Sequence, residues 1–377
     1  MTDPWLPLDE LRRRTTEKWR AHPVDVLPLF VAEMDTGLAE PVVRAVTEAM
    51  VLGDSGYPNG SGYAEAFAGF AGKRWGWEPA VEHTLLVPDV MAGLAEVLRG
   101  ATDPGDPIIL NDPVYPPFYE LIRYLGRQVV EVPLTPEHRL DLDALAATFA
   151  ELSGRGRVAH LLCNPQNPTG TVHTRDELTT LAGLAAEHGV RVVADEIHAP
   201  LVGGDYTPYL TVPGTATATV LHSASKGWNL AGLKAALAVA GAGVAGELAA
   251  LPSMVPDGAS HIAVLAHVAA LTEGGDWLDD LLSALTRNRA LLADLVTEHL
   301  PGVTYRPSPA TYLAWLDCRD AGLDGDPAAV FLERGKVALV SGPEFGTRGA
   351  GHVRFNLATS PEIITEAVHR MARALPG

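Results

Sequence analysis

Cysteine is scarce in this sequence. Only Cys163 and Cys318 occur among the 377 residues, and neither belongs to a Cys-x-x-Cys pair. This scarcity argues against a disulfide framework and against a zinc knuckle. Both thiols are therefore expected to be buried side chains of the core.

Positive charge is also in short supply. Lysine and arginine number 28 against 46 aspartate and glutamate residues, which gives a formal net charge of −18. Nucleic acids and anionic membranes both require a basic surface, so neither is expected as a partner. The total charge still leaves room for a locally cationic pocket that binds a small anion.

The chain lacks a long hydrophobic run and the motifs of common metal sites. Its most apolar stretch, residues 235–246, is flanked by Lys234 and Glu247 and is too short to cross a bilayer. Residues 1–14 contain no apolar core of a signal peptide, which predicts a cytoplasmic protein. The histidines show neither a His-Glu-x-x-His motif nor paired spacing, so no metal site is expected.

What the sequence does contain is an alternation of short apolar runs and helical patterns. Hydrophobic residues make up 47% of the chain, enough for a sizeable core. One helical pattern, residues 174–189, opens with a threonine cap and ends in glycine. The alternation predicts an α/β fold with a mostly parallel sheet that is covered by helices on both faces. The predicted strands are residues 107–110, 127–133, 158–163, 190–196, 218–224 and 236–241.

The last hundred residues follow a different pattern. Helical patterns at residues 277–300 and 360–375 flank the shorter runs TYLAWLDC and HVRFNLA. This mixture predicts a second, smaller α+β domain, with a boundary near residues 272–276. We expect a large domain at residues 37–272 and a small domain formed by residues 1–36 and 273–377.

Polar residues follow three of the predicted strands, where ligands of parallel sheets bind. They are the stretches NPQNPTG (164–170), DEIH (195–198) and SASK (223–226). An acid at the end of an apolar strand needs a cationic partner, and a lysine at similar depth has a lowered pKa that suits Schiff-base chemistry. The residues alone leave two interpretations open. One is a structural ion pair between Asp195 and Lys226, and the other is a pyridoxal phosphate site with an amine, an acid, an amide and a hydroxyl-lined phosphate grip.

With these motifs the sequence resembles the fold-type I, aspartate-aminotransferase-like family of pyridoxal-phosphate enzymes. Further stretches resemble its cystathionine β-lyase branch, the MalY/PatB group: RRRTTEKW (12–19), VAEMD (31–35), DEIHAPL (195–201) and SASKGWNLAGLK (223–234). The resemblance covers nearly the whole chain. It implies pyridoxal phosphate as cofactor, a seven-stranded sheet in the large domain, and a homodimer whose active sites are shared between subunits.

The resemblance also assigns roles around the cofactor ring. Lys226 would form the Schiff base and shuttle protons, and Asp195 would pair with the pyridinium nitrogen. Asn167 would bond the phenolate oxygen, with His198 nearby, and Tyr115 would stack on the ring.

Other residues would hold the phosphate and the substrate. The resemblance implies phosphate contacts from the hydroxyls of Ser223 and Ser225, the backbone N–H groups of Val90 and Met91, Lys234, and Tyr57 of the neighbouring subunit. Arg354, together with Asn167, would bind the substrate carboxylate, because a guanidinium fork suits bidentate contact.

Three positions depart from the family's pattern. Lys234 stands where many members place an arginine on the phosphate, and a lysine lacks the fork. Asp89 replaces a common glycine before the phosphate-binding helix, where an acid is unfavourable unless it points away. Leu29 and Phe30 replace the Met-Trp pair common in the branch, which can reshape the substrate pocket.

The implied reaction is β-elimination from cystathionine or another L-cysteine S-conjugate, giving a thiol, pyruvate and ammonia. An aminotransferase that acts on an amino acid and a 2-oxo acid stays open, as does a tailoring enzyme on an S-cysteinyl compound, because the reactions share one carbanion. A coexisting role in binding a regulatory protein also stays open, although no exposed motif supports it.

One further motif points elsewhere. GAGVAG (241–246) fits the Gly-x-Gly-x-x-Gly pattern of dinucleotide sites. No acid follows about 20 residues on, and the motif lies outside a first βαβ unit. We therefore expect a turn of small residues there.

Overall fold

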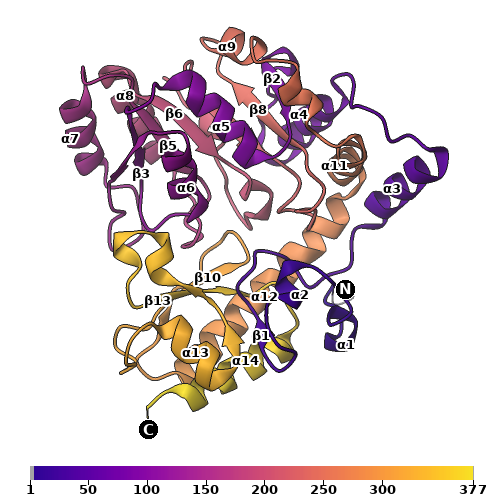
Figure 1. Cartoon of the computed structure of the whole chain (residues 1–377), viewed down its shortest axis with the longest axis vertical. Helices are drawn as coiled ribbons and strands as arrows, with labels where there is room; N and C mark the ends of the chain where they lie inside the picture. Colours follow the sequence, from indigo (N-terminus) through magenta and orange to yellow (C-terminus); the bar gives the residue numbers. More distant parts are fainter. Residues whose placement is uncertain (1–3, 377) are drawn as a thin grey trace.

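A seven-stranded sheet forms the largest layer of the computed structural model, which describes residues 4–376 (Figure 1). Its order is β2-β8-β7-β6-β5-β3-β4. Neighbouring strands from β3 to β7 are parallel, whereas β8 is antiparallel to both β7 and β2. The predicted mostly parallel sheet is confirmed. The strands are β2 (Thr84–Val87), β3 (Pro107–Leu110), β4 (Gln128–Glu131), β5 (Ala159–Cys163), β6 (Arg191–Asp195), β7 (Thr219–His222) and β8 (Ala236–Ala240).

Helices cover both faces of this sheet, as the continuous apolar strands predicted. Successive residues of a strand point to opposite faces. In β5, Leu161 belongs to the core shared with α5 (Val90–Ala101) and α6 (Pro117–Tyr124). Its neighbour Leu162 belongs to the core shared with α7 (Leu142–Leu152) and α8 (Arg175–His188).

A second, antiparallel sheet of order β12-β13-β10-β9 lies below the first in Figure 1. Two of its strands, β10 and β13, pair along five residues each. The helical patterns predicted at 277–300 and 360–375 form α12 and α14. The elements of this part are β9 (Thr304–Tyr305), β10 (Leu313–Asp317), β12 (Val340–Ser341), β13 (His352–Asn356), α12 (Gly275–His299), α13 (Pro327–Gly335) and α14 (Pro361–Ala374).

The N-terminal segment joins the C-terminal part of the chain. Strand β1 (Leu27–Pro28) pairs in parallel with β11 (Val337–Ala338). We therefore propose the division expected above, with residues 1–36 and 273–377 as one unit and residues 37–272 as the other. The remaining helices are α1 (Leu8–Leu11), α2 (Glu17–Arg20), α3 (Glu40–Leu52), α4 (Gly62–Trp75), α9 (Ala245–Ala249), α10 (Met254–Asp257) and α11 (His261–Glu273).

The GAGVAG stretch forms a turn between β8 and α9. A side chain at Gly241 would meet the carbonyl oxygens of Thr215 and Ala216 at 2.5 Å, so the close approach of two backbones requires glycine there. The expected turn of small residues is confirmed. Within residues 4–376, no helix combines the length and apolar character needed to span a membrane.

Candidate functional site

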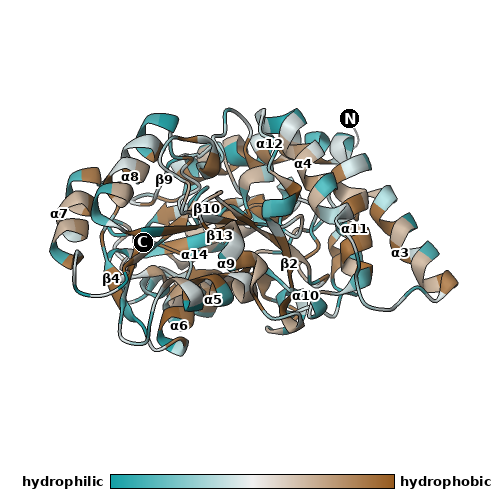
Figure 2. Ribbon diagram, turned by 90° about the horizontal axis from the view of Figure 1, so that it is seen from above, coloured by the Kyte–Doolittle hydropathy of each residue, from teal (hydrophilic) through white to brown (hydrophobic). Residues whose placement is uncertain are grey.

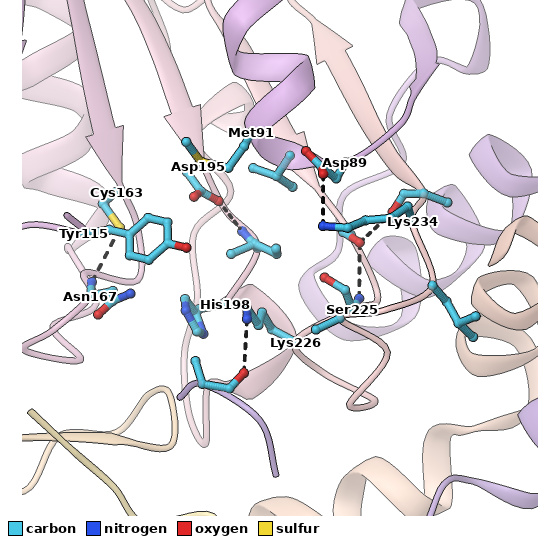
Figure 3. A pocket seen from close by; sticks show the side chains of 17 residues that line it. Asp89, Met91, Tyr115, Cys163, Asn167, Asp195, His198, Ser225, Lys226 and Lys234 are labelled. Carbon is cyan, nitrogen blue, oxygen red and sulfur yellow. Dashed lines mark hydrogen bonds and ion pairs between the residues drawn. The ribbon is translucent and has the colours of Figure 1, made fainter. Parts of the chain in front are cut away.

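A pocket lies at the carboxyl ends of β5, β6 and β7, where parallel sheets bind their ligands. Ten of the predicted site residues line it: Val90, Met91, Tyr115, Asn167, Asp195, His198, Ser223, Ser225, Lys226 and Lys234. Figure 3 shows Tyr115 and Asn167 at one end, Asp89 and Lys234 at the other, and Lys226 between them. The fold therefore brings together residues from five separate parts of the sequence.

Lys226 follows β7 and points its amine into the pocket. The Nζ atom donates to the carbonyl oxygen of Ala32 at 3.1 Å. Desolvation, aided by the charge of Arg354, lowers the pKa of Lys226 to about 8. An amine with this pKa exchanges protons near neutral pH, as a general base requires.

Asp195 ends β6, four of whose five residues are buried. Its Oδ1 accepts from the backbone N–H of Ile197 at 3.0 Å. Burial raises the pKa of Asp195 to about 7, against the opposing influence of Lys226. Asp195 and Lys226 line the same pocket, where the amine of Lys226 donates to Ala32. The carboxylate remains available to a cationic group of a ligand.

Arg354 reaches the site from β13 in the second sheet. One guanidinium nitrogen, Nη1, donates to Oδ1 of Asn167 at 3.1 Å, and Nη2 donates to the carbonyl oxygen of Phe30 at 2.9 Å. The ring of Phe345 lies 5.2 Å from the guanidinium carbon. Burial lowers the pKa of Arg354 to about 10, so the side chain stays cationic at neutral pH. Its buried Nε atom has no hydrogen-bond partner in the protein, which suits an incoming anion.

The end of the pocket near Asp89 and Lys234 is rich in hydrogen-bonding groups. The hydroxyl of Ser223 donates to the Ala235 carbonyl at 2.8 Å and accepts from the N–H of Ser225 at 3.2 Å. The N-terminus of α5 faces the same space through Val90 and Met91. Asp89 does not point away from the pocket, since its carboxylate lies 3.1 Å from the amine of Lys234.

Two aromatic side chains, Tyr115 and His198, line the pocket near Asn167. Tyr115 lines the pocket and packs edge-on against Phe118, with ring centroids 5.5 Å apart. Burial lowers the pKa of His198 to about 3, so its imidazole is neutral. The buried Nδ1 atom of His198 has no hydrogen-bond partner in the protein. It therefore offers a free position to a ligand.

Two predicted site residues do not line the pocket: Arg354, which contacts it through Asn167, and Tyr57. The side chain of Tyr57 is 82% exposed. An exposed position is what a contact to a neighbouring subunit requires. Its role in the partner's phosphate site therefore stays a prediction.

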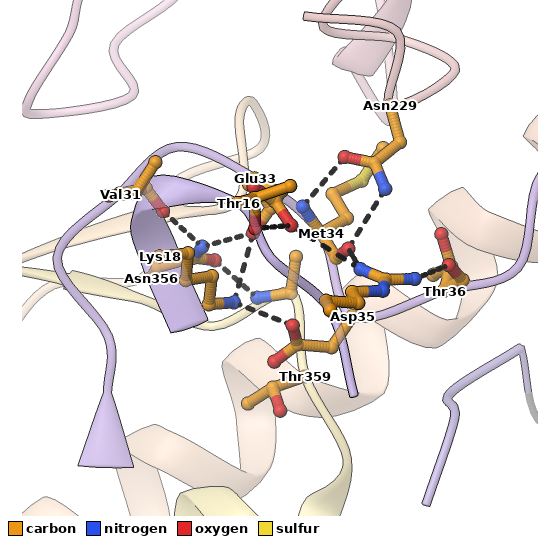
Figure 4. A network of polar contacts seen from close by, with 12 residues as sticks. Thr16, Lys18, Val31, Glu33, Met34, Asp35, Thr36, Asn229, Asn356 and Thr359 are labelled. Carbon is orange, nitrogen blue, oxygen red and sulfur yellow. Dashed lines mark hydrogen bonds and ion pairs between the residues drawn. The ribbon is translucent and has the colours of Figure 1, made fainter. Parts of the chain in front are cut away.

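Sequence reasoning did not foresee the hydrogen bonds of a segment that we call the strap, residues 30–36. Side chains of other elements bind its backbone carbonyls in succession (Figure 4). Ala32 accepts from both Lys226 and the hydroxyl of Tyr312, the latter at 3.0 Å. The other strap carbonyls also accept from side chains: residue 30 from Arg354, residue 31 from Asn356, residue 33 from Asn356 and Lys18, residue 34 from Asn229 and Arg14, and residue 36 from Arg14.

A buried ion pair anchors the strap. Lys18 of α2 lies 2.9 Å from Asp35, and both side chains are at most 1% exposed. The sequence offered one signal for this arrangement, the combination of EKW with VAEMD, but nothing in it indicated which groups face each other. The strap links Arg354 to Lys226 through the carbonyl oxygens of Phe30 and Ala32.

Cys163 was expected to be buried, which is confirmed, but it also lines the pocket. Its Sγ accepts from the backbone N–H of Asn167 at 3.4 Å and donates to the carbonyl of Pro165 at 3.5 Å. Burial raises the pKa of this thiol far above its usual value, so it is not a nucleophile. The thiol instead fixes the turn that carries Asn167.

The residues present suit pyridoxal phosphate. The amine suits the aldehyde of that cofactor, and the buried carboxylate suits its ring nitrogen. The amide paired with a guanidinium suits the phenolate oxygen, and the hydroxyls beside a helix N-terminus suit the phosphate. Across the described chain, no cluster of histidine, cysteine, aspartate and glutamate could hold a metal ion.

Comparison with known proteins agrees with this geometry. The family model "Aminotransferase class I and II" matches residues 25–371. A Mycobacterium tuberculosis protein provisionally named cystathionine beta-lyase is 54% identical over 98% of this chain and 97% of its own length. The cystathionine beta-lyase of Corynebacterium glutamicum is 36% identical over 98% and 99%. A crystal structure from Corynebacterium diphtheriae, provisionally described as a PLP-dependent beta-cystathionase, superposes with a TM-score of 0.94, 35% identity and 99% coverage of both chains.

Proposed function

The chain belongs to the class I and II aminotransferase family, and we propose that within it the protein is a pyridoxal-phosphate-dependent carbon–sulfur β-lyase. Its substrate class is cystathionine and other L-cysteine S-conjugates, which it cleaves to a thiol, pyruvate and ammonia. The observation that carries the cofactor chemistry is the convergence of Lys226, Asp195 and Asn167 in one pocket, with Arg354 hydrogen-bonded to Asn167 beside it. The names of relatives that match over the full length favour elimination over other outcomes.

When bound, pyridoxal phosphate withdraws electrons from the α-carbon of an amino acid and thereby acidifies its α-hydrogen. Lys226 supplies the base, because its lowered pKa leaves a substantial share of amine unprotonated near pH 8. Once the amine of Lys226 has accepted a proton, the resulting ammonium donates a hydrogen bond to the carbonyl oxygen of Ala32.

Asp195 and Arg354 orient the reactants. A cationic ring nitrogen beside Asp195 favours the ionised carboxylate and lowers its pKa from about 7. Arg354 binds the substrate carboxylate as a planar fork while it keeps hold of Asn167. The neutral imidazole of His198 contributes a hydrogen bond without adding a charge.

We propose that the protein works as a homodimer through the exposed face of α3. Figure 2 shows hydrophobic residues at the outer end of this helix. Large apolar side chains along α3 face solvent in the single chain: Val43, Met50, Val51 and Leu52. The exposed Tyr57 lies in the segment that follows α3, which is consistent with a role at the same interface. A patch of this kind marks a protein–protein contact rather than a monomer surface.

We also propose that the protein is cytoplasmic. Both cysteines are free and buried, which agrees with a reducing compartment.

The proposal is tested by thiol release from L-cystathionine, followed colorimetrically with purified, cofactor-loaded protein. We expect thiol release by the wild-type chain and none by Lys226→Ala. The matched control is Lys73→Ala, at an exposed lysine of α4. Thiol release by Lys226→Ala at the wild-type rate would remove Lys226 from the reaction.

A further inference from the structure

The carboxylate of Asp89 lies in the part of the pocket that suits a phosphate. It lines the same cavity as Ser223 and Ser225, at the end away from Tyr115 and Asn167 (Figure 3). The sequence marked Asp89 as a departure from the family, and the mechanism above makes no use of it. A negative charge at this position therefore needs a physical account.

Both oxygens of Asp89 already have partners. Oδ1 accepts from the backbone N–H of Ala92 in the first turn of α5 at 2.8 Å, and Oδ2 lies 3.1 Å from Nζ of Lys234. A helix N-terminal amide and an ammonium are the kinds of donor that a bound phosphate uses. The side chain of Asp89 thus occupies donors that serve an anion.

We propose that Asp89 competes with the phosphate of the cofactor for Lys234 and the N-terminus of α5, and so weakens cofactor binding. This inference rests on the proposed pyridoxal phosphate site and adds a determinant of its affinity. The Asp89–Lys234 pair is neutral as a unit, so it gives little net attraction to a dianion. A carboxylate at the N-cap also offsets the positive end of the helix dipole.

The size of the effect follows from the exposure of the pair. The side chains of Lys234 and Asp89 are 58% and 33% exposed, so water and salt screen their charges. We therefore expect removal of the Asp89 charge to tighten cofactor binding by roughly three- to tenfold at low ionic strength, not by orders of magnitude.

Asp89→Asn removes the negative charge at this position but keeps a side chain that can cap α5. Asparagine is as good an N-cap as aspartate, so α5 keeps its first-turn hydrogen bond. Asp141 supplies a matched control, because it caps α7 through the N–H of Ala144 at 3.0 Å and does not line the pocket. Asp141→Asn makes the same chemical change at the same kind of cap.

The experiment measures Kd for pyridoxal phosphate and for pyridoxal, with the cofactor-free full-length chain, at low and high salt. We expect D89N to bind pyridoxal phosphate roughly three- to tenfold more tightly than wild type, with a smaller difference at high salt. The affinity for pyridoxal, which carries no phosphate, should be unchanged. D141N should match wild type with both ligands.

Two results would overturn the inference. One is an unchanged or weaker affinity of D89N for pyridoxal phosphate, and the other is an equal gain for pyridoxal. Because the readout is binding, a failure of the lyase assignment would leave this result standing. Failure of the wild-type chain to bind pyridoxal phosphate would remove both the cofactor site and the inference.

Discussion

The chemistry of single residues in this pocket depends on the loss of water around them. Desolvation lowers the pKa of Lys226 to about 8, and burial raises that of Asp195 to about 7. Each shift disfavours the charged form of its group. The pocket therefore presents an amine and an acid that both titrate near neutral pH, which surface residues of the same types do not.

Arg354 gives the sharpest prediction at this scale. Arg354→Lys keeps the positive charge but loses the fork, so we expect KM for the amino-acid substrate to rise about tenfold or more while kcat changes less. Steady-state kinetics measure both values. The control is Arg319→Lys, at an arginine that pairs with Asp317 on the surface. An unchanged KM would mean that Arg354 does not bind the substrate carboxylate.

At the scale of elements, the strap connects Lys226 to the rest of the protein. Its carbonyls accept from α2, β13 and the turn at Asn229, and the buried Lys18–Asp35 pair fixes its end. Buried ion pairs contribute little net stability but are costly to break on one side only. The pair is therefore a sensitive point in the support of Ala32.

Lys18→Met tests this support. Methionine leaves Asp35 buried and unpaired, so we expect the free energy of unfolding to fall by roughly 3–5 kcal/mol, measured by urea denaturation. The double variant with Asp35→Leu should regain much of the loss. Lys73→Met, at an exposed lysine, should stay within about 0.5 kcal/mol of wild type. A Lys18→Met protein as stable as wild type would show that the pair does not anchor the strap.

The exposed end of α3 yields a prediction about assembly. Val51 is 84% exposed, and Val51→Glu puts a charge into the proposed dimer interface. We expect sedimentation to show a shift from dimer to monomer. Val24→Glu changes an equally apolar side chain, 71% exposed, outside α3 and should leave the dimer intact. A monomeric wild-type chain would contradict the proposed interface.

The elements differ in how far the sequence revealed them. Helix α8 was predicted to within one residue at each end because its signals are local: Thr174 and Glu177 form a capping box, and Gly189 adopts φ 68°. Strand β2 was not among the predicted strands, since it is a short edge strand in which only Val87 is buried. Local patterns reveal caps, but they do not reveal a half-exposed edge.

The site was predictable only where the topology dictated it. Three parallel strands are followed by the stretches that contain Asn167, Asp195 and Lys226. These stretches must lie at the same edge of the sheet, because parallel strands share their carboxyl ends. The contact of Asp89 with Lys234 was not predictable, although both residues had been singled out, because a pairing of distant residues depends on the folded backbone. The strap escaped prediction for a related reason, since its acceptors are backbone carbonyls that no side-chain motif encodes.

At the scale of the whole molecule, the site lies where two sheets and the N-terminal segment meet. Arg354 comes from the second sheet, Asp195 from the first, and Ala32 from the strap. The pocket is therefore complete only when the whole chain is folded, and conditions that loosen the fold also dismantle the site.

Buried histidines make the fold sensitive to acid. Burial lowers the pKa of His160 and His198 to about 3 and that of His267 to about 4. The unfolded chain binds these protons near pH 6.5, so stability is lost as the pH falls from about 6.5 toward 4. Asp195 acts in the opposite sense, since its raised pKa adds stability that is lost as the pH rises from about 4 through 7. Because the three histidines outnumber this one aspartate, we expect a net loss of stability in acid.

His160→Gln tests this balance. The glutamine keeps a hydrogen-bonding group near Asn111, which the Nε2 atom of His160 contacts at 2.6 Å. Urea unfolding at pH 7 and pH 5 should show a loss of stability in wild type that is smaller in the variant by up to about 2 kcal/mol. An identical loss in both proteins would mean that His160 does not contribute to the acid sensitivity.

The measurement that tests the central claim most directly is product analysis with L-cystathionine, with and without a 2-oxo acid, using purified cofactor-loaded protein. A carbon–sulfur β-lyase forms a thiol, pyruvate and ammonia without any oxo acid, and this is the predicted result. Conversion only in the presence of the oxo acid, with no thiol released, would contradict the account and identify an aminotransferase.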